Sequence, residues 1–390
     1  HQGIVVTDPP TPLPAAPRSF VLDGVRGLAI VLVVLSHSWK IWPEDARDGI
    51  GSFAALFNSG SVAVSIFFTI SGFLATRALL RARDSQGPTS ALGWFTRRTI
   101  RITVQMWVLL GAVWLMIRFD PTDLATDQVN RESLLSAATY TWNTYVRDHA
   151  LEARSDIGAL YFLGIDVQVL AVMTLLVVAV GKYRRVLGGV VLTALVLSSV
   201  WRSVDFAAHG WFHATLTTVD RLDAILWGVA AALIAPKLTW SRERAAAYLG
   251  AGTLILLGGI LSTAFFGLDA YFTWLGPIIG AATAMMVLGD DGAKGVPTMA
   301  GTLWSSDRLS MLGRMSLTIF LWHIPIFEAM ARHTPQWHPL PRSLVTIGVL
   351  IAVVALVERV VARPVDRLVG SWGRRPSARE PMATTRDKSP

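Results

Sequence analysis

The stretch GLAIVLVVLS, residues 27–36, decides the fold class, because it is an uncharged apolar run enclosed by Arg26 and His37. Such a run is typical of a helix that crosses a lipid bilayer. An α-helix turns about 100° per residue, so a spacing of eleven residues returns to within about 20° of the same face, about 16 Å farther along the axis. Arg26 and His37 are therefore predicted to lie on one stripe of a membrane-spanning helix.

Two interpretations of this polar pair are open from its spacing alone. Ionisable groups inside a membrane span are costly unless they face protein or water, so the pair indicates a functional site. Alternatively, Arg26 extends to one headgroup layer and His37 lies at the other, with neither residue taking part in chemistry.

The composition supports a membrane protein throughout the chain. Hydrophobic residues make up 52% of the 390 residues, charged residues make up 16%, and the mean hydropathy is +0.47. These values indicate a polytopic membrane protein. The net charge of +8 does not indicate nucleic-acid binding, because the basic residues form short clusters between apolar runs. The absence of cysteine excludes disulfides, thiolate metal ligands and a cysteine nucleophile.

Ten apolar segments follow one another, so we predict an all-α protein with about ten transmembrane helices. They are residues 20–40, 60–80, 99–118, 157–180, 186–203, 219–236, 246–266, 271–289, 314–331 and 343–362. Residues 1–18 are rich in proline and begin with His1, which predicts a disordered arm and not a signal peptide. We expect one membrane domain at 19–364 and a disordered basic tail at 365–390.

Alternate loops are basic, and this sets the expected orientation. Arginine and lysine collect in residues 77–101, 182–185 and 237–244 and after residue 363. The intervening loops carry acidic and aromatic residues, above all 119–156, which we expect to form an outer lid. The positive-inside rule then places both termini in the cytoplasm. Arg26 is predicted to lie toward the cytoplasm and His37 toward the outer face.

Five motifs in order along residues 20–364 resemble those of the acyltransferase-3 family of integral membrane acyltransferases. They are LDGVRGLA at 22–29 with His37, FFTISGFL at 67–74, WFTRRTIR at 94–101, DRLDAILWG at 220–228, and LGRMS at 312–316 followed by LWH at 321–323. The hallmark of that family is an arginine, ten residues and a histidine, and Arg26 and His37 fit it.

Two motifs depart from the family pattern. Where the family usually has glutamates and a glutamine, this chain has Asp166 and Gln168. Where a glutamate-arginine-proline usually closes the last helix, residues 362–364 read ARP, and Glu358 four residues before Ala362 is expected to replace the missing acid. Only 26 residues follow Pro364, so we expect no appended extracytoplasmic domain.

The resemblance implies transfer of a short acyl group, acetyl or succinyl, from an acyl-CoA donor to a hydroxyl. A hydroxyl needs a base near pH 7, and histidine suits that task, so His37 is the predicted catalytic group. It acts either as general base or as a transient acyl carrier. Arg26 is expected to hold the donor or to stabilise developing charge, and Asp166 is the expected catalytic acid.

Further polar residues are assigned supporting roles. Arg97, Arg98 and Arg101 are predicted to bind donor phosphates, although topology and lipid contact explain any single one of them equally well. Ser71 and Gly72 are predicted to contact the donor, with close helix approach as the alternative. The predicted supporting network comprises Asp23, Gln168, Asp220, Arg221, Asp223, His323 and Glu358. Intrahelical pairing is the alternative for the aspartate-arginine group, and a kink before Pro325 is the alternative for His323.

We expect no metal. His209 and His213 are four residues apart in a predicted outer loop, but the sequence positions no acidic third ligand, and Trp211 and Phe212 indicate an interface belt.

The competing function is a proton-coupled transporter or flippase, which would also need buried charges. No internal repeat supports it. For the acyltransferase we expect an envelope glycan or glycolipid acceptor at the inner membrane of a bacterium. A macrolide or another secondary metabolite is the alternative acceptor.

Overall fold

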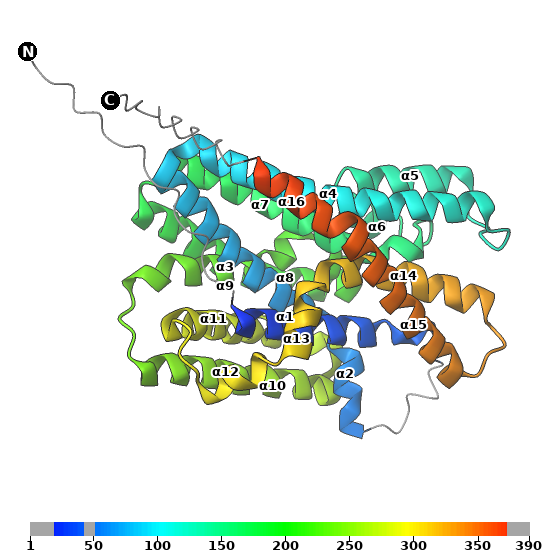
Figure 1. The fold of residues 1–390 in the computed structure, drawn as a ribbon. Coiled ribbons are helices and arrows are strands. Elements are labelled where there is room, and N and C mark those ends of the chain that lie inside the picture. The colour runs from blue at the N-terminus through cyan, green and yellow to red at the C-terminus, as the bar shows by residue number, and fades with distance from the viewer. Residues whose placement is uncertain (1–18, 43–50, 373–390) are drawn as a thin grey trace, which may run out of the picture.

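The computed structural model describes residues 19–42 and 51–372, and within these residues every regular element is a helix (Figure 1). Each of the ten predicted apolar segments falls on a helix. These are α1 (Phe20–Ser36), α3 (Gly60–Gln86), α4 (Pro88–Phe119), α7 (Tyr161–Val180), α8 (Arg184–Leu216), α9 (Thr218–Ile234), α10 (Arg242–Ala270), α11 (Gly276–Ala293), α14 (Ser316–His333) and α15 (Pro339–Val357). The shorter helices are α2 (Ala54–Asn58), α5 (Asp127–Ala138), α6 (Trp142–Asp148), α12 (Met299–Trp304), α13 (Asp307–Arg314) and α16 (Arg363–Ser371).

The protein is an all-α polytopic membrane protein. In its described residues, seven helical segments are long and apolar enough to cross a membrane, or eight if the bent pair α13 and α14 forms one span. One of the seven, Arg242–Ala293, contains both α10 and α11, which fold back on each other. Gly289 contacts the backbone near Leu249, and Gly259 packs against Ile279. Helix α9 has 17 residues. The count of ten spans therefore remains a prediction.

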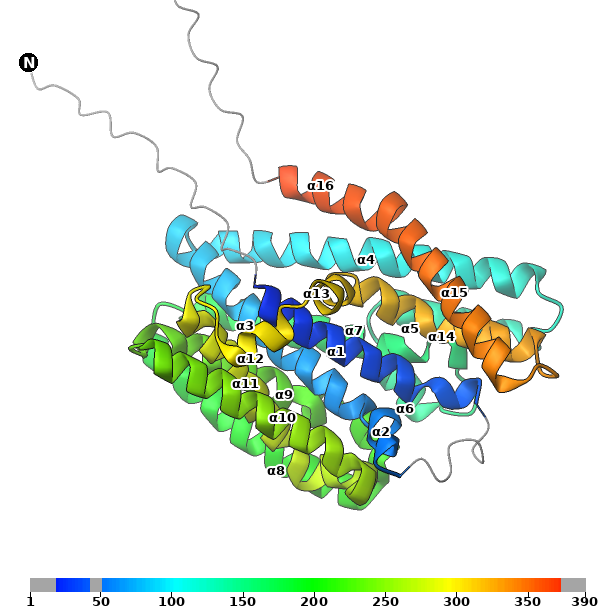
Figure 2. The same ribbon diagram turned by 60° about the horizontal axis from the view of Figure 1, so that its bottom comes forward.

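Helix α1, which carries Arg26 and ends just before His37, is held in place by very close contacts with neighbouring helices. Figure 2 shows α1 between α3 and the α13–α14 segment. A Cβ atom on Gly27 would lie 2.1 Å from the carbonyl oxygen of Leu309, and one on Gly313 would lie 1.7 Å from that of Asp23. Only glycine permits this approach of two backbones. The contact brings the start of α14 beside Arg26.

The charged residues separate toward two ends of the helix bundle. At one end Arg77 pairs with Asp291, and Arg184 pairs with Asp84 at 2.5 Å. We call this the basic end. The opposite end carries the segment from Asp120 to Asp156 and the last turn of α14. We call this the acidic end. Arg26 and His37 lie toward the basic and acidic ends respectively, in the order that the charge pattern predicts.

Three segments are more helical than the sequence suggested. Helix α8 continues to Leu216 with a break at Gly210, so His209 and His213 lie on helical turns on either side of this break and not in a loop. Helix α16 extends beyond the predicted domain boundary at residue 364, since Val369 is buried and Asp366 pairs with Arg101. The expected lid contains α5 and α6. The predicted arm at 1–18 and residues 373–390 of the predicted tail lie outside the described residues.

Candidate active site

His37 stands where α1 ends, and its ring lies against that of His323 from α14. The Nδ1 atom of His37 is 3.3 Å from Nε2 of His323, and the ring centroids are 5.0 Å apart. His323 is completely buried and His37 is half-buried. The two residues are 286 positions apart, so only the packing of α1 against α14 brings them together.

The hydrogen bonds of this histidine pair assign its neutral tautomers. Nδ1 of His37 lies 2.8 Å from the carbonyl oxygen of Val33, and a carbonyl only accepts, so this nitrogen carries the proton. Nδ1 of His323 likewise donates to the carbonyl of Phe320 at 2.7 Å, which leaves Nε2 of His323 able to accept from His37. Nε2 of His37 therefore has a lone pair. It makes no hydrogen bond within the described part of the chain, and such a nitrogen can take a proton.

The end of α1 explains why the His37 ring is so oriented. His37 has left the helical conformation, with φ −97° and ψ 4°, and its backbone N–H donates to Val34 instead of Val33. The carbonyl of Val33 is then satisfied by two side chains, Ser36 at 2.8 Å and His37 at 2.8 Å. The last turn of a helix leaves such carbonyls open, and here they fix the imidazole.

A cavity of about 360 Å³ lies farther toward the basic end, and four arginines line it. We call it the arginine cavity. Its charged lining residues are Arg26, Arg98, Arg101, Arg314, Asp166, Glu358 and Asp366. Arg26 donates to Ser316 at 2.9 Å and lies 4.0 Å from Asp23. The arginine cavity falls within the size range of small-molecule sites.

Asp166 is a member of the arginine cavity and not a partner of His37. It is 3% exposed, accepts from Ser71 at 2.6 Å and pairs with Arg98 at 3.2 Å. Arg98 also donates to Ser71 at 2.9 Å. The predicted acid thus positions an arginine, whereas the neighbour of His37 is a second histidine.

Glu358 also lines the arginine cavity, from a π-helical turn that follows α15. Thr318 donates to Glu358 at 2.5 Å, and Gln105 lies 3.2 Å from the same hydroxyl. Gln105 lies on α4, Thr318 on α14 and Glu358 on the turn after α15. These hydrogen bonds therefore tie three segments together around the cavity.

A second cavity of about 850 Å³ opens at the basic end. We call it the basic-end cavity. It shares Arg26 and Leu74 with the arginine cavity, so the two adjoin. Its basic lining residues also include Arg77, Arg81 and Lys294. Neither Arg81 nor Lys294 forms an ion pair with another described residue, and both are available to a ligand anion.

The side chain of Phe320 lies near both the arginine cavity and the histidine pair. Phe320 lines the cavity, packs on Phe162 with a centroid distance of 5.0 Å, and lies 5.7 Å from the ring of His323. Phe320 therefore lies beside both the arginine cavity and the ring of His323.

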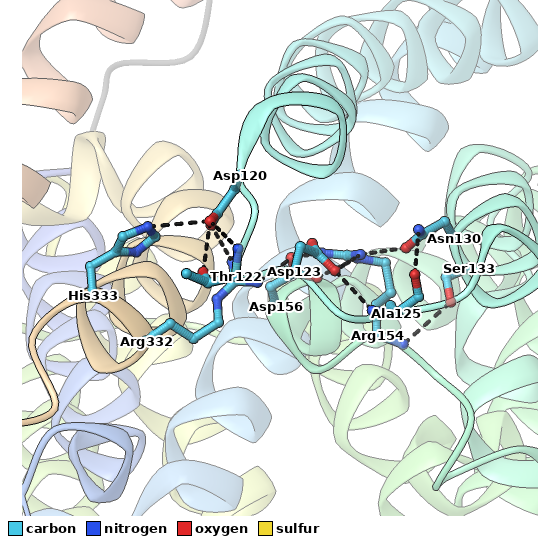
Figure 3. A network of polar contacts seen from close by, with 10 residues as sticks. All are labelled: Asp120, Thr122, Asp123, Ala125, Asn130, Ser133, Arg154, Asp156, Arg332 and His333. Atoms are coloured by element: carbon cyan, nitrogen blue, oxygen red, sulfur yellow. Dashed lines mark hydrogen bonds and ion pairs between the residues drawn. The ribbon is translucent and has the colours of Figure 1, made fainter.

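The acidic end holds a dense polar network, which Figure 3 shows. Arg154 donates from its guanidinium to Asp123 at 2.7 Å, to Asp156 at 3.0 Å and to Asn130. Arg332 of α14 lies 3.5 Å from Asp123. Burial alone would raise the pKa of Asp123, but the hydrogen bonds and charge of Arg154 outweigh it, so this pKa is lowered.

The neighbouring carboxyl of Asp120 behaves in the same way. His333 lies 3.3 Å and Arg332 3.7 Å from Asp120, whose oxygen also accepts from the hydroxyl of Thr122 at 2.6 Å. Burial opposes ionisation, yet the hydrogen bonds from Thr122 and the neighbouring His333 and Arg332 lower the pKa of Asp120. The network therefore joins the segment after α4 to the end of α14.

A third cavity, of about 350 Å³, lies beside this network, and we call it the outer cavity. Asp123, Glu152, Asp156 and Glu328 supply its carboxylates, with Arg154 and Arg332 among its other lining residues. Glu328 pairs with Lys40, which lies three residues after His37. The outer cavity is thus connected by one ion pair to the turn that carries His37.

Several predicted site residues lie elsewhere. Gly72 does not line the arginine cavity, because it packs against the carbonyl of Ile225, 2.3 Å from where a Cβ would stand. This agrees with the close-approach alternative. Arg97 is also absent from the cavity lining, whereas Arg98, Arg101 and Ser71 are present.

The predicted supporting network is divided among separate contacts. Asp223 pairs with Arg202 at 2.6 Å, and Arg221 donates to Tyr271 at 2.7 Å. Gln168 donates to Asn143 at 3.0 Å and accepts from Thr218 at 2.7 Å, which ties α7 to α6 and α9.

Other polar residues at the site were not predicted from the sequence. They are Lys40, Gln105, Arg314, Ser316, Thr318 and Glu328. Ser316 and Arg314 fall within the quoted LGRMS motif, so that motif carried a signal for them. Nothing local in the sequence distinguishes Gln105 or Lys40, because their partners are more than 200 positions away.

A sequence model described as an acyltransferase domain, Acyl_transf_3, matches residues 20–358. The chain belongs to the acyltransferase-3 family. This acyltransferase is 24% identical over 322 residues to "Putative membrane-bound transacylase BcsY" of Komagataeibacter xylinus, covering 78% of this chain and 72% of that protein. No solved structure matches it.

Two similar proteins are named for peptidoglycan. "Putative peptidoglycan O-acetyltransferase YrhL" of Bacillus subtilis is 27% identical over 83% of this chain and 52% of its own length. "Peptidoglycan O-acetyltransferase OatA" of Listeria monocytogenes is 22% identical over 89% of this chain and 55% of its own length. The acyltransferase described here thus spans about half the length of these two relatives. Family membership establishes the enzyme class and favours it over the transporter alternative.

Proposed function

We propose that this acyltransferase moves an acetyl or succinyl group from acyl-CoA, bound at the basic end, to a hydroxyl of an envelope glycan or glycolipid at the acidic end. The observation that carries the proposal is the lone pair on Nε2 of His37, oriented by Val33 and His323. The proposed location is the inner membrane of a bacterium, with the basic end in the cytoplasm, as the distribution of arginine favours.

The two adjoining cavities at the basic end support an acyl-CoA donor. A guanidinium binds phosphate through paired N–H groups, and Arg98 lines the cavity with an Nη1 that donates to no described residue. Arg26 belongs to both cavities, so it is the residue that a long donor would pass. In this proposal Arg26, Arg98 and Arg101 hold the donor's polar parts, while Asp166 and Ser71 keep Arg98 in position.

The proposed reaction needs one proton acceptor. The acceptor hydroxyl oxygen attacks the thioester carbonyl, a carbon–oxygen bond forms and the carbon–sulfur bond breaks. Nε2 of His37 takes the hydroxyl proton, and Nδ1–H of His37, shared by Val33 and His323, stabilises the imidazolium that results. The proton then passes to the thiolate that leaves.

The outer cavity supports a polar acceptor. Carboxylates and guanidinium groups bond well to sugar hydroxyls, and Glu152 and Glu328 add to the aspartates there. The relatives named for peptidoglycan O-acetylation agree with an envelope glycan as the acceptor class.

The test compares O-acyl esters in the envelope of cells that express the wild-type protein, His37→Ala or no protein. We expect esters with the wild type alone. Labelled acetyl-CoA supplied to inside-out vesicles should label the same acceptor. An alanine variant that accumulates normally and still restores the esters would overturn the assignment of His37. Label retained on the protein after denaturation would instead indicate a covalent acyl-histidine.

A further inference from the structure

A cluster of metal-ligating side chains lies at the acidic end, on the last turns of α8 and away from His37. Asp205, His209 and His213 each offer a ligand atom, and the three atoms lie within 4.8 Å of one another. Nδ1 of His209 is 3.0 Å and Nδ1 of His213 is 2.7 Å from a carboxylate oxygen of Asp205. Asp205 is the acidic third ligand that the spacing of the two histidines alone did not reveal.

A neighbouring carboxylate is a second unusual feature of this cluster. Asp220, at the start of α9, is 0% exposed, and neither of its carboxylate oxygens accepts a hydrogen bond from any residue that the structure describes. Its carboxyl group neighbours that of Asp205 and acts on it electrostatically. Two neighbouring buried carboxylates repel each other unless a proton or a cation lies between them.

Arg202 and Arg221, whose charges act on Asp220, make their hydrogen bonds to other groups. Arg202 pairs with Asp223 at 2.6 Å and donates to the carbonyl of Phe272. Arg221 donates to the carbonyl of Thr215 at 3.2 Å and to Tyr271. In the described residues, therefore, no arginine or lysine forms a hydrogen bond or ion pair with Asp205 or Asp220, and Arg147, Arg202 and Arg221 act on these carboxylates only through longer-range charge.

We propose that Asp205, His209 and His213 bind one divalent transition-metal ion, with Asp220 as the fourth ligand or as the acceptor for a metal-bound water. Two imidazoles and a carboxylate suit Zn²⁺, which takes ligands at about 2.0–2.2 Å in a tetrahedron. Ligands on one such ion lie within about 4 Å of one another, so the cluster needs only a small adjustment. The His209 side chain is 56% exposed and free to make it.

If both histidines are neutral, they bind the metal ion without releasing a proton. In each imidazole the Nδ1 proton moves to Nε2, and the freed Nδ1 lone pair binds the ion. The metal would also stabilise a break in α8, because Gly210 interrupts the helix between the two histidines with φ 80° and ψ 177°. It would join both sides of this break to the start of α9.

The test uses the detergent-purified full chain, expressed without a histidine tag, stripped with a chelator and dialysed against Zn²⁺. We expect one Zn²⁺ per chain and a higher melting temperature with Zn²⁺. His209→Ala should weaken binding at least about tenfold and abolish the thermal shift. His333→Ala removes another histidine of the acidic end and should leave both measurements unchanged. Because His209 is exposed, its variant is expected to fold.

Two further measurements complete the test. Asp220→Asn keeps the shape of the side chain and should lower affinity if the carboxylate faces the ion. If the stripped wild type binds no Zn²⁺, or the double variant His209→Ala/His213→Ala binds as the wild type does, the proposal is overturned. The two histidines would then serve only as hydrogen-bond donors to Asp205.

Discussion

Arg154 at the acidic end and Arg98 in the arginine cavity each pair with aspartate but differ in how many of their N–H groups are bonded. All three guanidinium nitrogens of Arg154 donate to described residues, and its side chain is 4% exposed. Arg98 pairs with Asp166, is 28% exposed and has an Nη1 that donates to no described residue. A saturated arginine holds structure together, whereas one with a spare donor facing a cavity can bind a ligand anion.

The histidine pair lies between these two regions, and the largest effect is expected there. His37→Ala removes the proposed base and should lower acyl transfer by about 10²–10⁴-fold. His323→Ala keeps the base but removes one hydrogen-bond partner of His37, so it should have a smaller effect. The measurement is the initial rate of labelled acetyl transfer in vesicles at matched protein levels. Equal losses in the two variants would contradict separate roles for the two rings.

The comparison of the two arginines predicts opposite consequences for binding and stability. Arg98→Ala should raise the donor KM by about tenfold or more, because a hydrogen bond to a charged group contributes about 1.5–3 kcal/mol. Arg154→Ala should leave the donor KM unchanged and lower the free energy of unfolding by about 3 kcal/mol, since two buried carboxylates lose their partner. Donor kinetics and thermal melting measure the two effects.

A matched control separates ligand binding from the charge that Arg98→Ala leaves behind. The double variant Arg98→Ala/Asp166→Asn removes the unpaired carboxylate, so stability should recover while the donor KM stays high. If instead Arg154→Ala raises the donor KM as much as Arg98→Ala, saturation does not distinguish the two regions.

The acidic end is also expected to respond to pH. The pKa values of Asp120 and Asp123 are lowered in the folded protein. A carboxyl with a depressed folded pKa contributes stability that is complete above its unfolded pKa of about 3.9 and is lost as pH falls through the folded value. Limited proteolysis of residues 119–156 should therefore accelerate below about pH 4. The Asp123→Asn variant should be cleaved faster than the wild type at pH 7, and its cleavage rate should change less on acidification. A variant whose cleavage rate depends on pH as that of the wild type does would contradict this.

The smallest effect is expected at the hydrogen bond that Ser316 accepts from Arg26. Ser316→Ala removes this acceptor and should raise the donor KM about threefold to tenfold, because the bond contributes about 1 kcal/mol. Ser262→Ala alters a hydroxyl that bonds to its own helix and lines none of the three cavities, and serves as the control. An unchanged KM in Ser316→Ala would show that Arg26 does not need Ser316 to hold the donor.

The sequence alone was sufficient for the helices and the family, and it predicts the stripe that joins Arg26 to His37. Apolar length and charge pattern act within one segment, so each of the ten predicted spans lies on a helix. The same local reasoning placed Arg98, Arg101 and Ser71 near a donor site, and the structure gathers them around the arginine cavity. It could not tell which of Arg97 and Arg98 lines the cavity. The two lie on different faces of one helix, and the sequence does not say which face meets the cavity.

Only the tertiary structure decided which groups meet. His323 and not Asp166 lies against His37, and Asp205 neighbours Asp220 beside two histidines, because α1 packs on α14 and α8 packs on α9. Such contacts depend on how helices cross, which close glycine approaches at Gly27 and Gly313 determine here. Composition and periodicity describe one helix at a time, so they specify the faces of the helices but not the partners of those faces.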